Sequence, residues 1–394
     1  MTSKPPPAPS PIHLIRHHTT NITSLYISSD NERLYSADAS GRILCSSTRS
    51  LRPIASWQAH SDSVLGVEEV KGKVVTQGRD HKLFVWRQPE RRGTQIAGSA
   101  TVRGEEPGKL AEMDVNALNY CRFSILPSAE DQDDVLIALP NLVESAYADI
   151  WRLESQERVH AAVGKRTPFS NEAMDGRGKS KSGIIMLLHL LPPSELDHSR
   201  LLMGFENGSV VLWGYDPAQN QGRSTSVEGV GWTALREWKV HVDTIMGLAI
   251  STDYSFALSV SADHLLGKYD LVAEAGKAET VRTKHPGHGS IAIKDDGRVC
   301  AVGGWDGNIR LYSTKSSKPL GTLSFHRKSV DRLVFAHSFL PEKDEGQDES
   351  EDEDEDEDGY ILTRKGKERR GRWIVSGDAD GKVAVWELVD FGRK

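Results

Sequence analysis

The sequence predicts an all-β fold, a β-propeller of seven four-stranded blades. One motif recurs with a fixed layout, and its turns stand 40, 65, 62, 56, 43 and 74 residues apart. The two shortest intervals match the roughly 40 to 45 residues of one propeller blade, so loops account for the longer ones. The chain start supplies a strand that the last repeat lacks. The turn positions are Ser40, Asp80, Ser145, Asn207, Asp263, Asp306 and Asp380.

Three repeats carry the full motif, in which an Asp follows a Ser or Thr by four residues and precedes an aromatic residue by six. A His/Ser/Asp trio suggests a catalytic triad, but a triad would occur once and this trio recurs with the blades, which favours a structural role. The three sets are His60, Thr76, Asp80 and Trp86; His241, Ser259, Asp263 and Tyr269; and His326, Ser376, Asp380 and Trp386.

Four weaker repeats keep the spacing but lose individual letters of the motif. Two of them retain a histidine, His18 and His288, and the other two have none and end near Trp151 and Trp213. Together with the full copies they make seven blades.

The two ends of the chain are expected to close the ring. Apolar residues stand six and three positions before each strong motif histidine, and Ile12 and Ile15 stand in the same way before His18. Only eight residues follow Trp386, too few for another strand. We therefore expect Ile12 to Arg16 to complete the last blade, which removes two exposed sheet edges.

The predicted domain organisation is a proline-rich disordered tail at 1–10, a propeller at 11–390, and a disordered insertion at about 341–372. Glu342 to Asp358 holds 13 acidic residues and one base, so like charges repel and nothing apolar can be buried. Ser350 lies among these acids as a candidate phosphorylation site. The segment from Arg364 to Arg372 has six bases and one acid. It is interpreted as a self-screening solvated loop, with nuclear import or a histone or nucleic-acid contact as alternatives.

Patterns for other chemistry are incomplete, and we expect no catalytic residue, cofactor or metal site. Gly178-Lys179-Ser180 resembles the end of a phosphate-binding loop, but Ala173 stands where that loop needs Gly. The pairs His17-His18 and His285/His288 lack a third ligand at a suitable spacing. The longest apolar stretch, Gly183 to Leu191, is about half of a bilayer span, so no membrane association is expected.

What remains is surface for protein partners. In a propeller the turn with the blade Asp and the segment after the blade His emerge on one face. The candidate partner-binding residues at such positions are Arg79, Glu206, Trp305, Arg327 and Lys328. Trp305 is either an interface anchor, because aromatic residues are favoured there, or a cover for the neighbouring blade.

These repeats resemble the WD-repeat family, in which such His, Ser/Thr, Asp and aromatic sets form hydrogen-bonded relays between strands. The stretches Trp57-Gln58-Ala59-His60, Gly303-Gly304-Trp305-Asp306-Gly307 and Ser376-Gly377-Asp378-Ala379-Asp380-Gly381, together with the proline-rich start, are similar to the fungal ASTRA-associated WD-repeat proteins and to animal G-protein-beta-subunit-like proteins. The resemblance covers residues 11 to 390.

This resemblance implies a non-catalytic scaffold subunit of a nuclear complex linked to chromatin remodelling and to maturation of phosphatidylinositol-kinase-like protein kinases. Its expected partners are cochaperone-type subunits, AAA-family ATPases and those kinases, without direct nucleic-acid binding. A monomer is expected outside the complex, in the nucleus or also the cytoplasm. Alternatives are a G-protein beta-like signalling adaptor and a histone-binding WD-repeat chaperone. Five prolines in the first 11 residues oppose the N-terminal helix of both.

Overall fold

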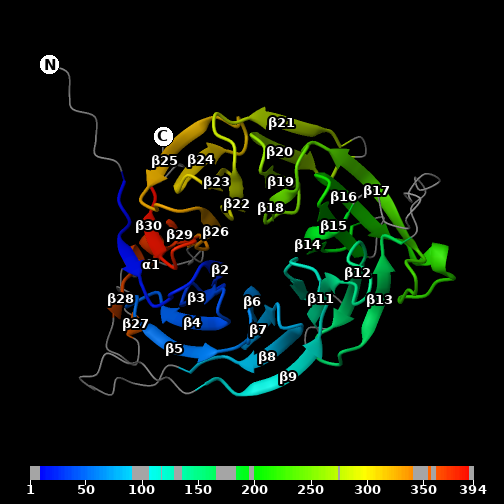
Figure 1. Cartoon of the computed structure of the whole chain (residues 1–394), viewed down its shortest axis with the longest axis horizontal. Coiled ribbons are helices and arrows are strands. Elements are labelled where there is room, and N and C mark those ends of the chain that lie inside the picture. The colour runs from blue at the N-terminus through cyan, green and yellow to red at the C-terminus, as the bar shows by residue number, and fades with distance from the viewer. Residues whose placement is uncertain are drawn as a thin grey trace, which may run out of the picture. The chain divides into compact units, whose positions relative to one another are not determined.

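The computed structural model describes residues 9–90, 106–116, 118–127, 135–165, 183–194, 199–273, 276–339, 354–355 and 361–389. Seven four-stranded sheets in these residues form the predicted seven-bladed β-propeller (Figure 1). Most of the predicted tail and of the acidic run lies outside the described residues, as do Ser350 and Gly178-Lys179-Ser180. The chain divides into two compact units, one of Met1–Gly78, Phe84–Ala111 and Ala292–Lys394 and the other of Arg79–Leu83 and Glu112–Ile291.

The first unit, called unit 1, carries blades one and seven, most of blade two, and blade six from Ala292 onwards. Each blade is one four-stranded sheet. Blade one contains β2 (Ile22–Ile27), β3 (Arg33–Asp38), β4 (Arg42–Ser47) and β5 (Pro53–Gln58), and blade two contains β6 (Val64–Val70), β7 (Lys73–Gly78), β8 (Lys82–Arg87) and β9 (Lys109–Asp114). Blade six contains β22 (His288–Ile293), β23 (Val299–Gly304), β24 (Asn308–Ser313) and β25 (Pro319–Ser324). Blade seven has the order β1 (His13–Ile15), β30 (Val383–Glu387), β29 (Trp373–Asp378) and β26 (Val330–Phe335).

The second unit, called unit 2, carries blades three, four and five. Blade three contains β10 (Ser124–Pro127), β11 (Val135–Pro140), β12 (Ala148–Arg152) and β13 (Arg158–Val163). Blade four contains β14 (Ile185–Leu191), β15 (Ser199–Phe205), β16 (Ser209–Tyr215) and β17 (Trp232–Lys239), with the 3₁₀ helix Pro217–Asn220 between the last two. Blade five contains β18 (Ile245–Ile250), β19 (Phe256–Ser261), β20 (Leu265–Asp270) and β21 (Ala278–Arg282).

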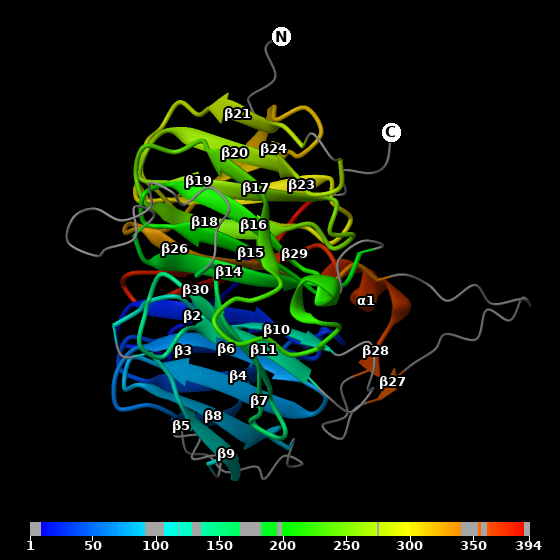
Figure 2. The ribbon, with the colours of Figure 1, turned by 90° about the vertical axis from the view of Figure 1, so that its right-hand side faces the viewer.

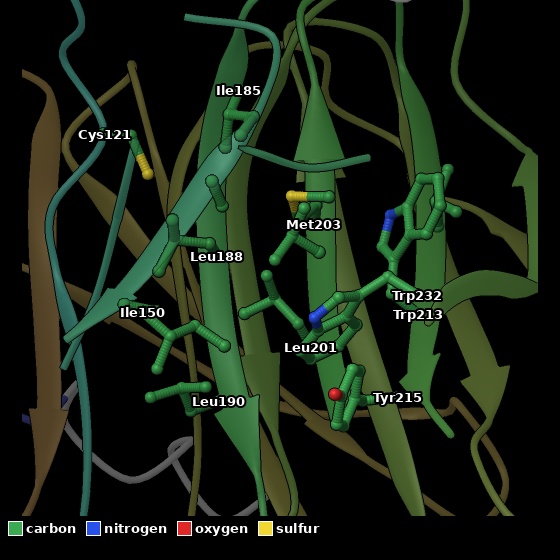
Figure 3. Packing of buried hydrophobic residues seen from close by; sticks show 14 of the residues in the cluster. Cys121, Ile150, Ile185, Leu188, Leu190, Leu201, Met203, Trp213, Tyr215 and Trp232 are labelled. Carbon is green, nitrogen blue, oxygen red and sulfur yellow. The ribbon is translucent and has the colours of Figure 1, made fainter. Parts of the chain in front are cut away.

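The core of unit 2 lies between the faces of neighbouring blades. Figure 3 shows Ile150 of β12 beside Leu188 and Leu190 of β14, and Ile185 of β14 and Leu201 of β15 belong to the same buried cluster. All five side chains are at most 5% exposed. Alternate residues of a strand point to opposite faces of the sheet, so strands buried on both faces are apolar almost throughout.

The predicted closure of the ring by the chain start is confirmed. β1 pairs antiparallel with β30, with His13 opposite Val385 and Ile15 opposite Val383. The N–H of Ile12 also donates to the carbonyl of Val385 over 2.8 Å. Figure 1 shows the two strands side by side at the edge of blade seven. The strand is shorter than expected, since it spans His13–Ile15 and not Ile12 to Arg16.

A tight turn holds the closing segment against blade seven. Gly381 has φ +77°, and a Cβ built on it would lie 2.7 Å from the carbonyl oxygen of Thr20 and 3.0 Å from that of His18. The turn between β29 and β30 therefore packs directly on the backbone that joins β1 to β2. Only glycine allows both this backbone conformation and this approach.

We predict that Gly381→Ala lowers the free energy of unfolding by about 2 kcal/mol or more, because a side chain at positive φ is strained and its Cβ meets backbone atoms. Urea denaturation measures the loss. The control is Gly321→Ala in β25, where a Cβ would meet nothing within 4 Å. Equal stability of the two variants would contradict this account of the turn.

The end of the predicted disordered insertion is ordered, which corrects the sequence prediction for residues 361–372. Arg364–Arg370 forms the helix α1, and the hydroxyl of its N-cap residue Thr363 accepts the N–H of Gly366 over 3.2 Å. β27 (Asp354–Glu355) and β28 (Ile361–Leu362) pair before it. Figure 2 places α1 and this pair together at one side of unit 1. The insertion does separate β26 from β29, as expected.

Arg370 is the physical reason for this order. Its side chain is 5% exposed, and its guanidinium donates to Glu32 Oε1 over 2.9 Å and to Thr48 Oγ1 over 2.7 Å. Arg49 donates to the other oxygen of Glu32 over 2.6 Å. Burial alone would raise the pKa of Glu32, but the hydrogen bond from Arg49 and the charge of Arg370 outweigh it and lower this pKa from 4.5 to about 2. The sequence prediction compared charges that are close together along the chain. It therefore could not show that an acidic residue of blade one binds this segment.

We predict that Arg370→Met lowers the free energy of unfolding by about 1 to 3 kcal/mol, because it removes a charged hydrogen-bond donor from the half-buried Glu32 carboxylate. Because the pKa of Glu32 is lower in the folded chain, its stabilisation is present above pH 4.5 and is lost as the pH falls towards 2. Chemical denaturation between pH 2 and 7 should therefore show the difference between wild type and Glu32→Gln shrinking below pH 4.5. Arg364→Met, at an exposed position of α1, is the control and should change little. A pH-independent difference would contradict the pairing.

Candidate protein-interaction surface

The motif histidines are buried and connect strands of their blades. In blade seven His326 Nδ1 lies 2.7 Å from Asp378 Oδ2 and Nε2 lies 2.8 Å from Ser376 Oγ. Trp386 Nε1 donates to Ser376 Oγ over 2.9 Å. The tautomer with the proton on Nδ1 lets the indole donate to the hydroxyl, the hydroxyl to the imidazole, and the imidazole to the carboxylate.

The relay carboxylate of blade seven is Asp378 and not the predicted Asp380, so that prediction is wrong. Asp378 Oδ1 also accepts the backbone N–H groups of Asp380 and Lys382, each over 2.9 Å. Burial disfavours its charge, but the hydrogen bond from His326 and the N–H of Lys382 outweigh burial and hold the pKa of Asp378 below its usual value. Asp380 is exposed and contacts Lys382 Nζ over 3.2 Å.

Blade one repeats this arrangement, which the sequence pattern missed. His18 Nδ1 lies 2.7 Å from Asp38 Oδ2, and its Nε2 lies 2.8 Å from Ser36 Oγ. Asp38 follows Ser36 by two residues, as Asp378 follows Ser376. Side chains two apart on a strand point to the same face. The spacing Ser-x-Asp was therefore the available signal in both blades.

In blade five the carboxylate comes from the predicted position. His241 Nδ1 lies 3.0 Å from Asp263 Oδ2, and its Nε2 lies 2.7 Å from Ser259 Oγ. The hydroxyl groups of Ser259 and Tyr269 lie 2.8 Å apart. Burial lowers the pKa of His241 despite its acidic neighbour.

Blade two places His60 Nε2 2.9 Å from Thr76 Oγ1, which also accepts the N–H of Trp86 over 2.9 Å. Asp80 is half-buried in the turn between β7 and β8. In blade six the turn acid has another partner, because Asp306 binds Arg310 through both carboxylate oxygens. The hydrogen bonds from Arg310 hold the pKa of Asp306 well below its usual range.

We predict that Asp378→Asn lowers the free energy of unfolding by about 1 to 3 kcal/mol, because the buried imidazole loses its charged acceptor. Asp380→Asn removes only an exposed ion pair and should cost less than about 1 kcal/mol. Urea denaturation of both variants checks this. A larger loss of stability for Asp380→Asn than for Asp378→Asn would indicate that Asp380 is the relay acid, as the sequence pattern predicted.

All five predicted surface residues are exposed, and each unit holds some of them. In unit 1 Trp305 is 49% exposed in the turn between β23 and β24. A Cβ on Gly307 of this turn would lie 2.3 Å from the carbonyl oxygen of His326 and 3.1 Å from that of Lys328. The turn with Trp305 thus lies directly against the segment that carries Arg327 and Lys328.

In unit 2 Arg79 and Glu206 each contact a different neighbour. The guanidinium carbon of Arg79 lies 4.5 Å from the ring centre of Tyr120, and its Nη2 donates to the phenol oxygen over 3.2 Å. Glu206 Oε2 accepts the N–H of Ile184 over 3.4 Å. Sequence reasoning missed Tyr120, which belongs to a blade without a motif histidine.

One pocket of about 420 Å³ lies in unit 1, a volume within the range of small-molecule sites. The ammonium group of the chain's own Lys109 lies 5.0 Å from the ring centre of Phe84 in its wall. Among the described residues, no group of three or more His, Cys, Asp or Glu could hold a metal ion, and no helix is long and apolar enough to cross a membrane. The lining residues are Gln58, Ala59, Phe84, Trp86, Glu106, Pro107 and Lys109.

The sheets and relays define a WD-repeat β-propeller protein, and comparison with known proteins agrees. The family model for the WD domain, G-beta repeat, matches residues 9–45 and 279–313. The chain is 28% identical to ASTRA-associated protein 1 of Verticillium alfalfae over 97% of this chain and 94% of that protein. It is 27% identical to ASTRA-associated protein 1 of Penicillium rubens, over 96% of this chain and 97% of that protein. The Schizosaccharomyces pombe protein of that name is 26% identical over 83% of this chain and 93% of its own length. These matches confirm the resemblance noted in the sequence.

Proposed function

We propose that this protein is a non-catalytic WD-repeat scaffold subunit of an ASTRA complex. The observation that carries the proposal is its similarity, over nearly the full length, to fungal proteins named ASTRA-associated protein 1. The proposed setting is the nucleus, in an assembly linked to chromatin remodelling and to maturation of phosphatidylinositol-kinase-like protein kinases. Cochaperone-type subunits and AAA-family ATPases are its proposed partners.

The burial and hydrogen bonds of the motif His, Ser and Asp residues support a scaffold role. In blade seven the side chains of His326 and Asp378 are both 0% exposed, and Ser376 already accepts the N–H of Trp386. A nucleophile needs an open approach and a base that can take its proton. The buried hydroxyl and imidazole instead stabilise the blade, which leaves the exposed residues for partner binding.

The surface of unit 1 supports the same role. Trp305, Arg327 and Lys328 adjoin on a rigid base, since the turn packs on the backbone of residues 326–328. Tryptophan and arginine are enriched among residues that contribute most to protein–protein binding. The basic pair would attract an acidic partner surface.

Purification of the tagged protein from nuclear extract, with identification of the co-eluting proteins, tests the proposal. We expect subunits of an ASTRA complex, in constant ratio to the tagged chain. The double variant Trp305→Ala, Arg327→Glu should lose part of these subunits at unchanged melting temperature, because it removes an exposed anchor and reverses a charge. The control Leu320→Ala, on the outer strand β25, should keep them. Recovery of heterotrimeric G-protein components alone would overturn the proposal in favour of a signalling adaptor.

A further inference from the structure

Blade three exposes a cluster of large apolar side chains at the end of its sheet where β10 begins and β11 ends. Leu118 is 78% exposed and Tyr120 54%, both in the segment before β10. Leu142 is 51% exposed and Val143 80%, both in the turn between β11 and β12. Single exposed apolar residues are common, but adjoining ones mark interaction sites.

Buried asparagine side chains bind the two loops to each other. Asn116 Nδ2 donates to the carbonyl of Asn141 over 2.5 Å, and Asn119 Nδ2 donates to that of Ser145 over 3.2 Å. These two bonds flank Leu118 in one loop and Leu142 and Val143 in the other. The two bonds hold these loops side by side, and we call the four exposed apolar residues on them, Leu118, Tyr120, Leu142 and Val143, the blade-three platform.

The platform is held in shape by further bonds to the same asparagines. Asn116 Oδ1 accepts the N–H of Leu118 over 2.8 Å, and Asn119 Oδ1 accepts that of Cys121 over 2.7 Å. Asn141 Oδ1 accepts the N–H of Val143 over 3.1 Å. Fixed loops lose little conformational entropy on binding, so the exposed apolar area can contribute to affinity.

Arg79 adds a positive charge to the platform. Its guanidinium lies over the exposed ring of Tyr120 and uses one of its five N–H donors on the phenol oxygen. Stacking leaves the edge of the guanidinium for a carboxylate, which it can bind through two parallel bonds. Glu144 follows Val143 and is exposed, so a partner with several adjacent carboxylates would be repelled.

We propose that the blade-three platform docks a segment of a partner protein that combines apolar side chains with one carboxylate, the apolar groups on Leu118, Leu142 and Val143 and the carboxylate on Arg79. This rests on the proposed scaffold function and identifies a second contact surface, in unit 2. Apolar contacts with a single charge fit a protein segment and not a nucleic-acid backbone.

Photo-crosslinking in the purified complex tests the position. In the full chain, benzoylphenylalanine replaces Val143 or, as a control, Val272. Val272 is 69% exposed and lies between β20 and β21 of blade five. We expect the Val143 probe to crosslink a partner segment with an Asp or Glu within a few residues of apolar side chains, and the Val272 probe not to. No crosslink, a crosslink to a second copy of this chain, or a segment without a carboxylate would overturn the proposal.

Binding of a synthetic peptide of the crosslinked segment tests the chemistry. The double variant Leu118→Ser, Val143→Ser should weaken binding about tenfold or more, whereas Val272→Ser should not. Arg79→Glu should weaken it similarly, and Lys277→Glu, with the same charge change at an exposed site, should not. Replacing the peptide carboxylate by lysine should restore binding to Arg79→Glu. If Arg79→Glu and Lys277→Glu behave alike, the carboxylate contact is wrong.

The identity of the crosslinked protein separates the two proposals. If ASTRA subunits co-purify but none crosslinks to Val143, the platform fails and the scaffold function stands. If no ASTRA subunit co-purifies, but a carboxylate-bearing segment of an unrelated protein crosslinks and its peptide shows the expected losses, the platform stands and the ASTRA assignment fails.

Discussion

The pairing of β1 with β30 is the constraint on which the rest of unit 1 depends. Three residues of β1 form a short ladder, and so few backbone bonds could not hold two chain ends by themselves. Side chains around the closure reinforce it. Ile15, Val383 and Val385 belong to one buried cluster with Leu25 and Trp373, which mixes residues of blades one and seven. Closure is therefore a packing event as well as a strand pairing.

Polar contacts also join blade one to blade seven. They come from residues on either side of the acidic run. Asn31 of blade one exchanges two hydrogen bonds with the backbone of His337, which follows β26, over 2.7 and 2.9 Å. Arg370 of α1 reaches Glu32 from the other end of the insertion. The residues on either side of the acidic run thus carry groups that join the first blade to the last. A break in one strand pair is costly because these contacts would be lost together.

The fold was predictable because its motif repeats. The relay acid of blade seven was predicted wrongly, because the motif placed the acid in the turn and not at the end of the strand. Spacing identified seven blades and the N-terminal closure, since each blade must bury the same faces. The motif assumed an acid four residues after the Ser, which holds for Asp263 but not for Asp378. Two geometries deliver a carboxylate to the same imidazole nitrogen: the end of the strand itself or the following turn. Where both positions are acidic, the strand position points to the histidine by its period of two.

Blade three shows what a repeat search cannot find. It has no motif histidine, and asparagine side chains connect its loops instead, as Asn116 and Asn119 do. The pattern of polar residues gave no reason to single them out, because their partners are backbone carbonyls distant in sequence. Leu118 and Tyr120 lie before β10, outside the sheet, and both side chains are exposed.

The buried histidines and tight glycine turns fix the backbone without using the neighbouring side chains. His326 is held in the core, while Arg327 and Lys328 after it are exposed. His241 is held in the same way, and the exposed residues after it are Val242 and Asp243. One backbone geometry therefore presents a basic pair in blade seven and an apolar and acidic pair in blade five. Since the stabilising groups and the displayed groups are different residues, a blade can change what it displays at little cost in stability. This separation suits the proposed scaffold role, because the candidate partner-binding residues Arg327 and Lys328 follow the buried His326 directly.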